Sequence, residues 1–232
     1  MNTWGLESKM DCSSCELKSE IFKILNCEEL ELVNRNKTQI IYNEGEIIIK
    51  QGTFMSNVLS INSGLVKVYL EGESHNTILR IVRPTNFIGG PGIYYDQLHH
   101  FSVAAMRKTT VCFIDLNTFR YLLDHNQGFM SAFMNDFSQN VILNYNRLIS
   151  LSQKHLAGRY ADAILYLFNN VFSGAAKTIN ISKVDLAELS AISRESSVKI
   201  LRQFQKEGIL KFAGKMLEIL DMEKLKMISK IA

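Results

Sequence analysis

The sequence has only two prolines and one tryptophan among 232 residues, and it contains no apolar run near the length of a membrane span. Because a helix needs roughly 20 apolar residues to cross a bilayer, we expect no membrane-spanning helix. The opening residues MNTWGLESKMDCSSC also lack the cationic start and the hydrophobic stretch of a secretory signal. We therefore expect a cytoplasmic protein without a membrane partner.

Catalytic signatures are missing as well. The chain has no P-loop, no nucleophile elbow, no HExxH sequence and no cysteine and histidine pair with a known signature. The sequence therefore gives no reason to assign an enzyme.

Cysteine is scarce, with four residues, three of them within the first 27 positions. So small a cluster does not predict the disulfide framework of a secreted domain. In a reducing compartment it indicates a metal site, redox chemistry or no special role.

The chain is long enough for two domains of medium size, and 47% of its residues are hydrophobic. Residues 154–232 carry 13 basic and 8 acidic side chains, whereas residues 1–153 carry 13 and 15. The basic excess therefore belongs to the C-terminal third.

Short apolar runs alternate with glycine-containing turns from Ile40 to Leu116. The runs are IIY, EIIIK, VLSI, LVKVYL, TILRIV, FSVAAM and VCFID. Glycine lets a chain turn sharp corners at little steric cost. The pattern predicts an antiparallel β-roll, similar to a double-stranded β-helix or jelly roll.

A long helical pattern follows from Leu116, is interrupted near Asn126 to Gly128 and ends near Ser152. Spacings of three, four and seven place one stripe along it: Met130, Phe133, Phe137, Val141, Asn144, Leu148 and Leu151. Such a stripe packs either on its own β domain or in a parallel two-helix dimer, where a buried asparagine fixes the register. We favour the dimer, with the stripe from Phe133 to Leu151 as its interface.

Two short helices and a hairpin are predicted near the C-terminus. Ser182 is placed to cap a helix from about Lys183 to Ser190, and Ser193 to cap a second helix that ends at Gly208. The runs GILKF and MLEIL then alternate around the turn AGK, which predicts two strands. This is the layout of a winged helix-turn-helix.

The second helix and the wing are basic, with six basic and two acidic residues from Arg194 to Lys215. A phosphate backbone favours such a surface, although a solvated helix face is the plain alternative. The candidate DNA-binding residues are Ser193, Arg194, Glu195, Ser197, Lys199, Arg202 and Lys215.

A glycine-cornered β-roll, a long helix and a C-terminal winged helix, in this order, resemble the CRP/FNR family of bacterial transcription regulators. The motifs that carry the resemblance are Gly45-Glu46-Ile47-Ile48, Ser63-Gly64-Leu65-Val66-Lys67-Val68-Tyr69 and Ser193-Arg194-Glu195-Ser196. The resemblance implies an α+β fold with a sensor domain at 1–125, a dimerisation helix at 126–153 and a winged-helix domain at 154–232. It also implies an effector-modulated homodimer that binds a near-palindromic duplex DNA operator and contacts RNA polymerase.

The resemblance also assigns roles on the second helix. Family members read bases with an arginine, the adjacent glutamate and a further basic residue, and those positions carry Arg194, Glu195 and Lys199. Arginine binds guanine bidentately and glutamate accepts from the cytosine amino group. Ala191 stands where the family has a left-handed glycine, so either alanine bears a cost of roughly 1 kcal/mol for that geometry or the turn is slightly different.

Family members that bind cyclic nucleotide hold the ribose with a glutamate and the phosphate with an arginine. Neither group is present here, because the matching segment is FIGGPG and a histidine pair replaces the arginine and serine. We therefore do not expect cyclic AMP as the effector. Backbone amides still make a candidate pocket for another small anion at Gly89, Gly90, Gly92, His99 and His100.

Oxygen-sensing family members hold an iron-sulfur cluster with four cysteines, and Cys12, Cys15, Cys27 and Cys112 match that number. Cys27, however, lies farther from Cys15 than the family pattern expects. An iron-sulfur cluster, a zinc site and no metal all remain open. Haem is a further possibility, with axial ligands from the nine methionines or from His75, His99, His100 and His155.

A competing interpretation is a module that binds a cyclic nucleotide or another small anion and does not read DNA directly. Salt-dependent binding to duplex DNA separates the two functions, because phosphate contacts release counterions.

Overall fold

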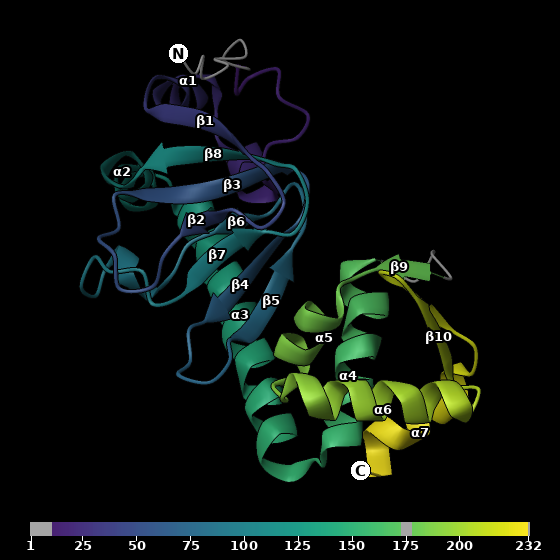
Figure 1. Ribbon diagram of the computed structural model, residues 1–232. Helices are drawn as coiled ribbons and strands as arrows, with labels where there is room; N and C mark the ends of the chain where they lie inside the picture. Colours follow the sequence, from purple (N-terminus) through teal and green to yellow (C-terminus); the bar gives the residue numbers. More distant parts are fainter. Residues whose placement is uncertain (1–10, 173–177, 232) are drawn as a thin grey trace. The chain divides into compact units, whose positions relative to one another are not determined.

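The computed structural model describes residues 11–172 and 178–231 (Figure 1). Contacts divide the chain into a first compact unit, Met1–Lys67 with Val82–Gln139, and a second, Val68–Ile81 with Asn140–Ala232. Residues 1–10 and 173–177, which fall in the predicted sensor and winged-helix domains, lie outside the described part. Among the described residues, no helix is both long and apolar enough to cross a membrane.

The β-rich segment forms two four-stranded sheets, and the predicted antiparallel roll is confirmed (Figure 1). The first sheet has the order β1 (Lys37–Tyr42), β8 (Thr109–Asp115), β3 (Asn57–Ser63) and β6 (Phe87–Ile88). The second has the order β2 (Ile47–Ile49), β7 (Ser102–Ala105), β4 (Val66–Leu70) and β5 (Thr77–Val82). In the first sheet β8 pairs antiparallel with both β1 and β3, so it lies in the interior.

The corner between β3 and β4 depends on Gly64. Its φ of +90° lies in the region that favours glycine, and an added Cβ would lie 2.3 Å from Thr109 Oγ1 and 2.5 Å from the Lys108 carbonyl oxygen. The Leu65 amide donates to Thr109 Oγ1 at 3.2 Å. Glycine at this predicted corner therefore lets β3 turn directly against the start of β8.

An aromatic cluster fills the core of the first unit. It joins the 3₁₀ turn η1 (Glu20–Ile24), β6, α2 (Leu116–His125) and the start of α3 (Gln127–Gln153) through Phe22, Phe87, Phe119, Phe129 and Phe133. The ring of Phe133 lies 6.0 Å from that of Phe87 and 5.8 Å from that of Phe119, and the residue is only 6% exposed. The prediction that Phe133 contacts a second chain is therefore wrong, because its ring is used inside its own domain.

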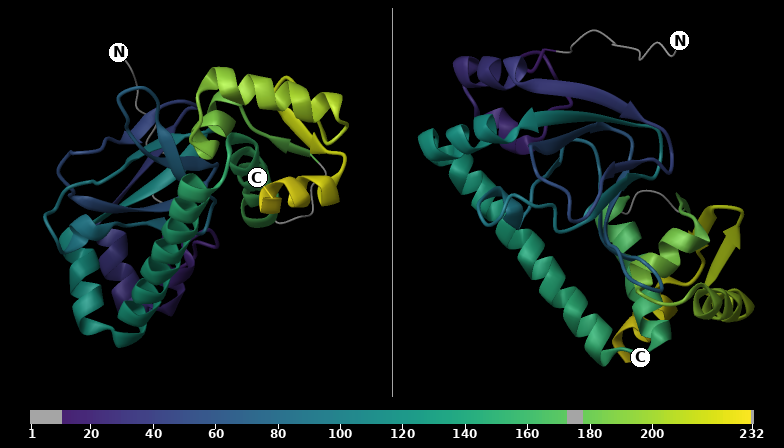
Figure 2. Two further views of the ribbon diagram at one scale, coloured as in Figure 1. Left: turned by 90° about the horizontal axis from the view of Figure 1, so that it is seen from below. Right: turned by 60° about the vertical axis from the view of Figure 1, so that its left-hand side comes forward.

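Helix α3 is long and continuous (Figure 2), and the predicted interruption before it is confirmed. Asn126 ends α2, and its side-chain oxygen accepts from the Phe129 amide at 2.9 Å. Its amide nitrogen donates to the Glu29 carboxylate on α1 (Cys27–Arg35) at 2.9 Å. Beyond the aromatic core α3 keeps a set of exposed apolar residues: Met134, Ile142, Leu143, Tyr145, Leu148 and Ile149.

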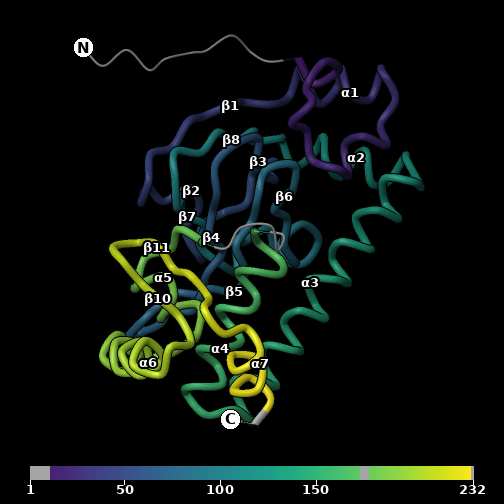
Figure 3. The backbone as a smooth tube through the Cα atoms, turned by 90° about the vertical axis from the view of Figure 1, so that its right-hand side faces the viewer, coloured from purple at the N-terminus to yellow at the C-terminus, as the bar shows by residue number. Residues whose placement is uncertain are grey.

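Helix α4 (Leu156–Tyr166) is central in the second unit and contacts α5 (Lys183–Ser190), α6 (Arg194–Lys206) and α7 (Met222–Ile231) (Figure 3). A π-helical turn at Leu167–Val171 follows it. Tyr160 of α4 is fully buried, and its ring meets that of Phe204 edge to face at 6.0 Å. One side of α6 packs against this core, and the opposite side is exposed.

Candidate nucleic-acid interface

Helices α5 and α6 each begin at a serine cap, and Ala191 ends α5. Ser182 Oγ accepts from the Asp185 amide at 3.0 Å, and Ser193 Oγ accepts from the Ser196 amide at 3.2 Å. Ala191 has φ 50° and ψ 50°, the left-handed conformation, and the amide of Ile192 donates back to Ala187 at 3.2 Å. The helices and their caps therefore agree with the sequence prediction, and alanine adopts the strained conformation usually given to glycine.

Two arginines hold this turn from behind. Arg147 of α3 donates from Nη2 to the Leu189 carbonyl at 2.6 Å, and Arg159 of α4 donates from Nη1 to the Ala191 carbonyl at 3.4 Å. Both accepting carbonyls lie at the C-terminal end of α5, where carbonyls lack partners within the helix and cations are favoured. The sequence carries no signal for these contacts, because each joins residues more than 30 positions apart.

Helix α6 has one buried and one exposed side. The buried side consists of Ser197, Ile200, Leu201 and Phe204. The exposed side carries Arg194, Glu195, Lys199 and Arg202. Ser197 is 1% exposed, and its hydroxyl donates to the Tyr160 hydroxyl at 3.4 Å. The prediction that Ser197 contacts DNA is therefore wrong, because it lies one turn before Leu201 on the buried side.

Hydrogen bonds at the start of α6 favour an ionised Glu195. The pKa of its carboxyl is lowered by a backbone amide, by the Ser193 hydroxyl and by the nearby Arg194 and Lys199. A carboxylate that keeps its charge is a hydrogen-bond acceptor only. It can therefore accept from an amino group that approaches the N-terminal end of α6.

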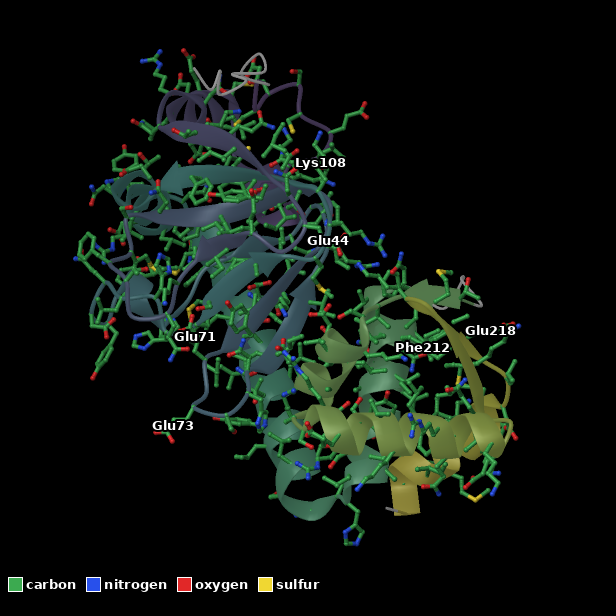
Figure 4. All side chains as sticks on the ribbon, in the orientation of Figure 1. Glu44, Glu71, Glu73, Lys108, Phe212 and Glu218 are labelled. Atoms are coloured by element: carbon green, nitrogen blue, oxygen red, sulfur yellow. The ribbon has the colours of Figure 1, made fainter. Side chains whose placement is uncertain are left out.

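The wing is a three-stranded sheet in the order β10 (Leu210–Ala213), β11 (Met216–Ile219) and β9 (Thr178–Asn180). The predicted hairpin is present, and sequence reasoning missed β9. Gly214 has φ +62° at the turn, next to the exposed Lys215. Phe212 and Glu218 come from the two strands of the hairpin (Figure 4). Glu218 lies opposite Lys211 in the register, and Lys183 Nζ lies 5.6 Å from the ring centroid of the buried Phe212.

The glycine-rich segment proposed as an effector pocket is closely packed. A Cβ on Gly92 would lie 2.1 Å from the Leu98 carbonyl oxygen, and one on Gly89 would lie 2.8 Å from the side chains of Phe87 and Ile93. A Cβ on Gly90 would meet the Phe101 ring at 3.0 Å. These contacts give the glycines a packing role that does not require a ligand.

The two histidines beside this segment differ. His99 is buried, and its Nδ1 has no hydrogen-bond partner among the residues that the structure describes. The pKa of His99 is lowered mainly by burial, and to a lesser degree by the neighbouring His100. His100 is exposed and its Nε2 lies 3.1 Å from the Asp96 carboxylate. The pair therefore does not present two cationic groups to an anion.

Three of the four cysteines come together. Cys12, Cys15 and Cys112 line a cavity of about 20 Å³, in which Lys37 Nζ donates to Cys12 Sγ at 3.0 Å. Burial raises the pKa of the Cys112 thiol to about 11. A cavity of that size holds about one water molecule.

Cys27 lies apart from this cavity and is exposed at the first position of α1. Over residues 11–172 and 178–231, no three histidine, cysteine or acidic side chains are placed to hold a metal ion. The described arrangement does not bring Cys27 to the other three cysteines, and a metal site at the four cysteines stays a prediction.

The histidines suggested as haem ligands do not converge. His75 Nδ1 lies 2.9 Å from Ser74 Oγ, and His155 is the exposed residue that precedes α4. His99 and His100 lie together but face different surroundings, one buried and one paired with Asp96. Met1 and Met10 fall outside the described residues. The side chains therefore add no support for haem.

Two family models match the sequence. One, described as a cyclic nucleotide-binding domain, matches residues 39–126, and one, described as a Crp-like helix-turn-helix domain, matches residues 158–228. The first covers most of the β-roll and α2, and the second contains the α5–α6 turn and the wing.

Curated relatives align over nearly the whole chain. Electron transport regulator A of Shewanella oneidensis is 25% identical, over 94% of this chain and 90% of its own length. The fumarate and nitrate reduction regulatory protein of Salmonella typhimurium is 24% identical, over 90% and 86%. Among solved structures, FixK2 from Bradyrhizobium japonicum has the same fold, with a TM-score of 0.74 at 16% identity, over 84% of this chain and 98% of its own.

Proposed function

The chain belongs to the CRP/FNR family of transcription regulators, with a Crp-like helix-turn-helix domain, and from this premise we propose that it binds a near-palindromic duplex DNA site as a homodimer. The observation that carries the proposal is the exposed, basic side of α6. This helix begins at the Ser193 cap, and its opposite side is buried. Helices of this kind place their N-terminal residues against base edges in the major groove.

Arg194 and Glu195, in the first turn of α6, are the proposed base readers, with Lys199 one turn later. A guanidinium fits guanine O6 and N7, and the ionised Glu195 accepts from a cytosine amino group. Ser193, Arg202 and Lys215 would serve as phosphate contacts that set the register without reading sequence.

The proposed dimer uses the exposed side of α3. Leu148 is 64% exposed, Tyr145 63% and Ile142 56%, and several large apolar side chains exposed together mark an interaction surface. Val141, Asn144, Leu148 and Leu151 of the predicted stripe lie in the same stretch, and Phe137 at its start also touches the core residue Phe133. The seam is therefore proposed to begin after the aromatic cluster.

Residues 1–125 are proposed to sense a signal, 126–153 to pair two chains and 154–232 to bind DNA. A signal would change the population in which both copies of α6 match the spacing of two half-sites. Action on DNA in the cytoplasm, together with RNA polymerase, follows from the same proposal.

The test is selection of bound sequences from a random duplex library by the wild-type protein, Arg194→Ala and Glu195→Ala. We expect a two-fold symmetric site with half-sites about 10 base pairs apart. Each variant should lose preference at one position of each half-site, by roughly 1–3 kcal/mol. Arg35→Ala, at an exposed residue of α1, is the charge-matched control. Binding without sequence preference, or identical preferences in all four proteins, would contradict the proposal.

A further inference from the structure

The second unit contains a cavity of about 190 Å³ behind the α5–α6 turn. Its apolar walls include Leu79, Leu143 and Leu151, and all of its lining residues belong to this unit. Pockets for drug-sized ligands usually measure roughly 300–1,000 Å³. This cavity therefore suits a smaller molecule with an apolar part.

The charged groups of the lining are unequal in number, with the guanidinium groups of Arg80, Arg147 and Arg159 and the single carboxylate of Asp162. That carboxylate is already used: Lys154 Nζ lies 2.8 Å from it, and the hydroxyls of Ser150 and Ser229 donate to it at 2.6 Å. Asp162 is therefore not the partner of Arg147 or Arg159 in this lining.

Two donors in the lining are unused. The Nε atoms of Arg147 and Arg159 are buried, and neither has a hydrogen-bond partner among the described residues. Burial lowers the pKa of Arg147 to about 10, so its guanidinium is less well solvated than usual yet charged at neutral pH. A buried donor without a partner costs about 1–3 kcal/mol, and more when it is charged.

We propose that this cavity binds a small organic anion, with a carboxylate or phosphate group held by Arg147 and Arg159 and an apolar part against the leucine walls. The planar guanidinium is the side chain best matched to either anion, because it donates two parallel hydrogen bonds. No motif in the sequence marks this site, which is separate from the glycine-rich segment at residues 87–92.

A ligand bound in the cavity would also affect the helix-turn-helix. The same two guanidiniums donate to the carbonyls of Leu189 and Ala191, so an anion bound to them would alter how firmly the turn is held. Ligand and DNA would then change each other's affinity by the same factor. This consequence rests on the proposed function, whereas binding to the cavity does not.

The experiment is calorimetric titration of the full-length protein, without DNA, with benzoate, phenyl phosphate, benzyl alcohol and inorganic phosphate. We expect benzoate or phenyl phosphate to bind at least about tenfold more tightly than the neutral alcohol or the inorganic ion, a difference of about 1.4 kcal/mol. Tighter binding of one aromatic anion than of the other tells whether the site prefers carboxylate or phosphate.

Arg147→Met and Arg159→Met should each weaken binding about tenfold or more. Asn146→Asp, at an exposed residue of the cavity lining, should weaken it while both arginines remain in place. Arg35→Met removes one exposed arginine of the first unit and should bind like the wild type. The proposal is overturned if no probe saturates the protein, if the three cavity variants bind normally, or if binding is lost with Arg194→Ala instead, which would place the anion on α6.

Discussion

The hydroxyl of Ser197 donates to the phenol oxygen of Tyr160 at 3.4 Å, in the core between α6 and α4. Both side chains are almost fully buried, and burial raises the pKa of Tyr160 to about 12. The contact lies on the same side of α6 as the buried Ile200, Leu201 and Phe204, and it adds a polar link to that apolar packing. Arg194, Lys199 and Arg202 lie on the exposed side.

Ser197→Ala should lower the free energy of unfolding by about 1 kcal/mol, since it leaves the buried Tyr160 hydroxyl without this partner. DNA base preference should not change. Chemical denaturation of Ser197→Ala, Tyr160→Phe and the double variant measures the coupling between the two hydroxyls. If the effects of the single variants simply add, the hydrogen bond does not contribute to stability.

Ala191→Gly should remove a steric cost of roughly 1 kcal/mol and so stabilise the protein by less than that amount, because glycine adopts the left-handed conformation at φ 50° freely. The greater entropy of glycine in the unfolded chain offsets part of this gain. Ala187→Gly, in the interior of α5, should instead destabilise. Equal losses in both variants, measured by thermal unfolding, would show that the turn is relaxed with alanine.

Leu148→Asp should convert a dimer to a monomer without unfolding it, since Leu148 is 64% exposed in the single chain. Light scattering gives the mass, and circular dichroism checks the fold. Ser131→Asp is the control, because it adds the same charge at an exposed position near the start of α3, where an acidic residue is tolerated. A Leu148→Asp protein that stays dimeric would place the seam elsewhere.

Cys27 should react with iodoacetamide first in the native protein, because it is the exposed cysteine of the four. Cys15 and Cys112 should react only after unfolding, since both are buried and the raised pKa of Cys112 disfavours its thiolate. Mass spectrometry of timed samples locates each label.

Iron, sulfide and zinc analysis of protein purified without oxygen tests the thiol cavity for metal, and retention of any metal by Cys27→Ser is expected.

Stability should fall as the pH drops below about 6.5, because the pKa of His99 is lower in the folded protein than in the unfolded chain. In this window the unfolded state binds the extra proton, so acid favours unfolding; the loss ends once the pH passes below the folded-state pKa. His99→Gln should reduce the slope of unfolding free energy between pH 7 and pH 5. An unchanged slope would show that His99 is not the group responsible.

Local features of this chain were predictable, and long-range ones were not. The serine caps and the turn at Gly214 follow from a few neighbouring residues, whereas the left-handed position of Ala191 was implied only by the family resemblance. Ser197 and Phe133 were assigned to the wrong surface because spacing along a helix gives its period but not which side the rest of the fold covers. Phe133 is buried by Phe87 and Phe119, which no pattern within α3 reveals.

The arginines behind the α5–α6 turn have a consequence for the kind of signal that can act there. Burial lowers the pKa of Arg147 to about 10, which is still well above neutral pH, so the guanidinium stays charged near neutrality and keeps its contact with Leu189. A change of pH near neutrality therefore does not release this contact. A signal that weakens the contact would instead be a bound anion that competes for the guanidinium, or a displacement of α3, which carries Arg147.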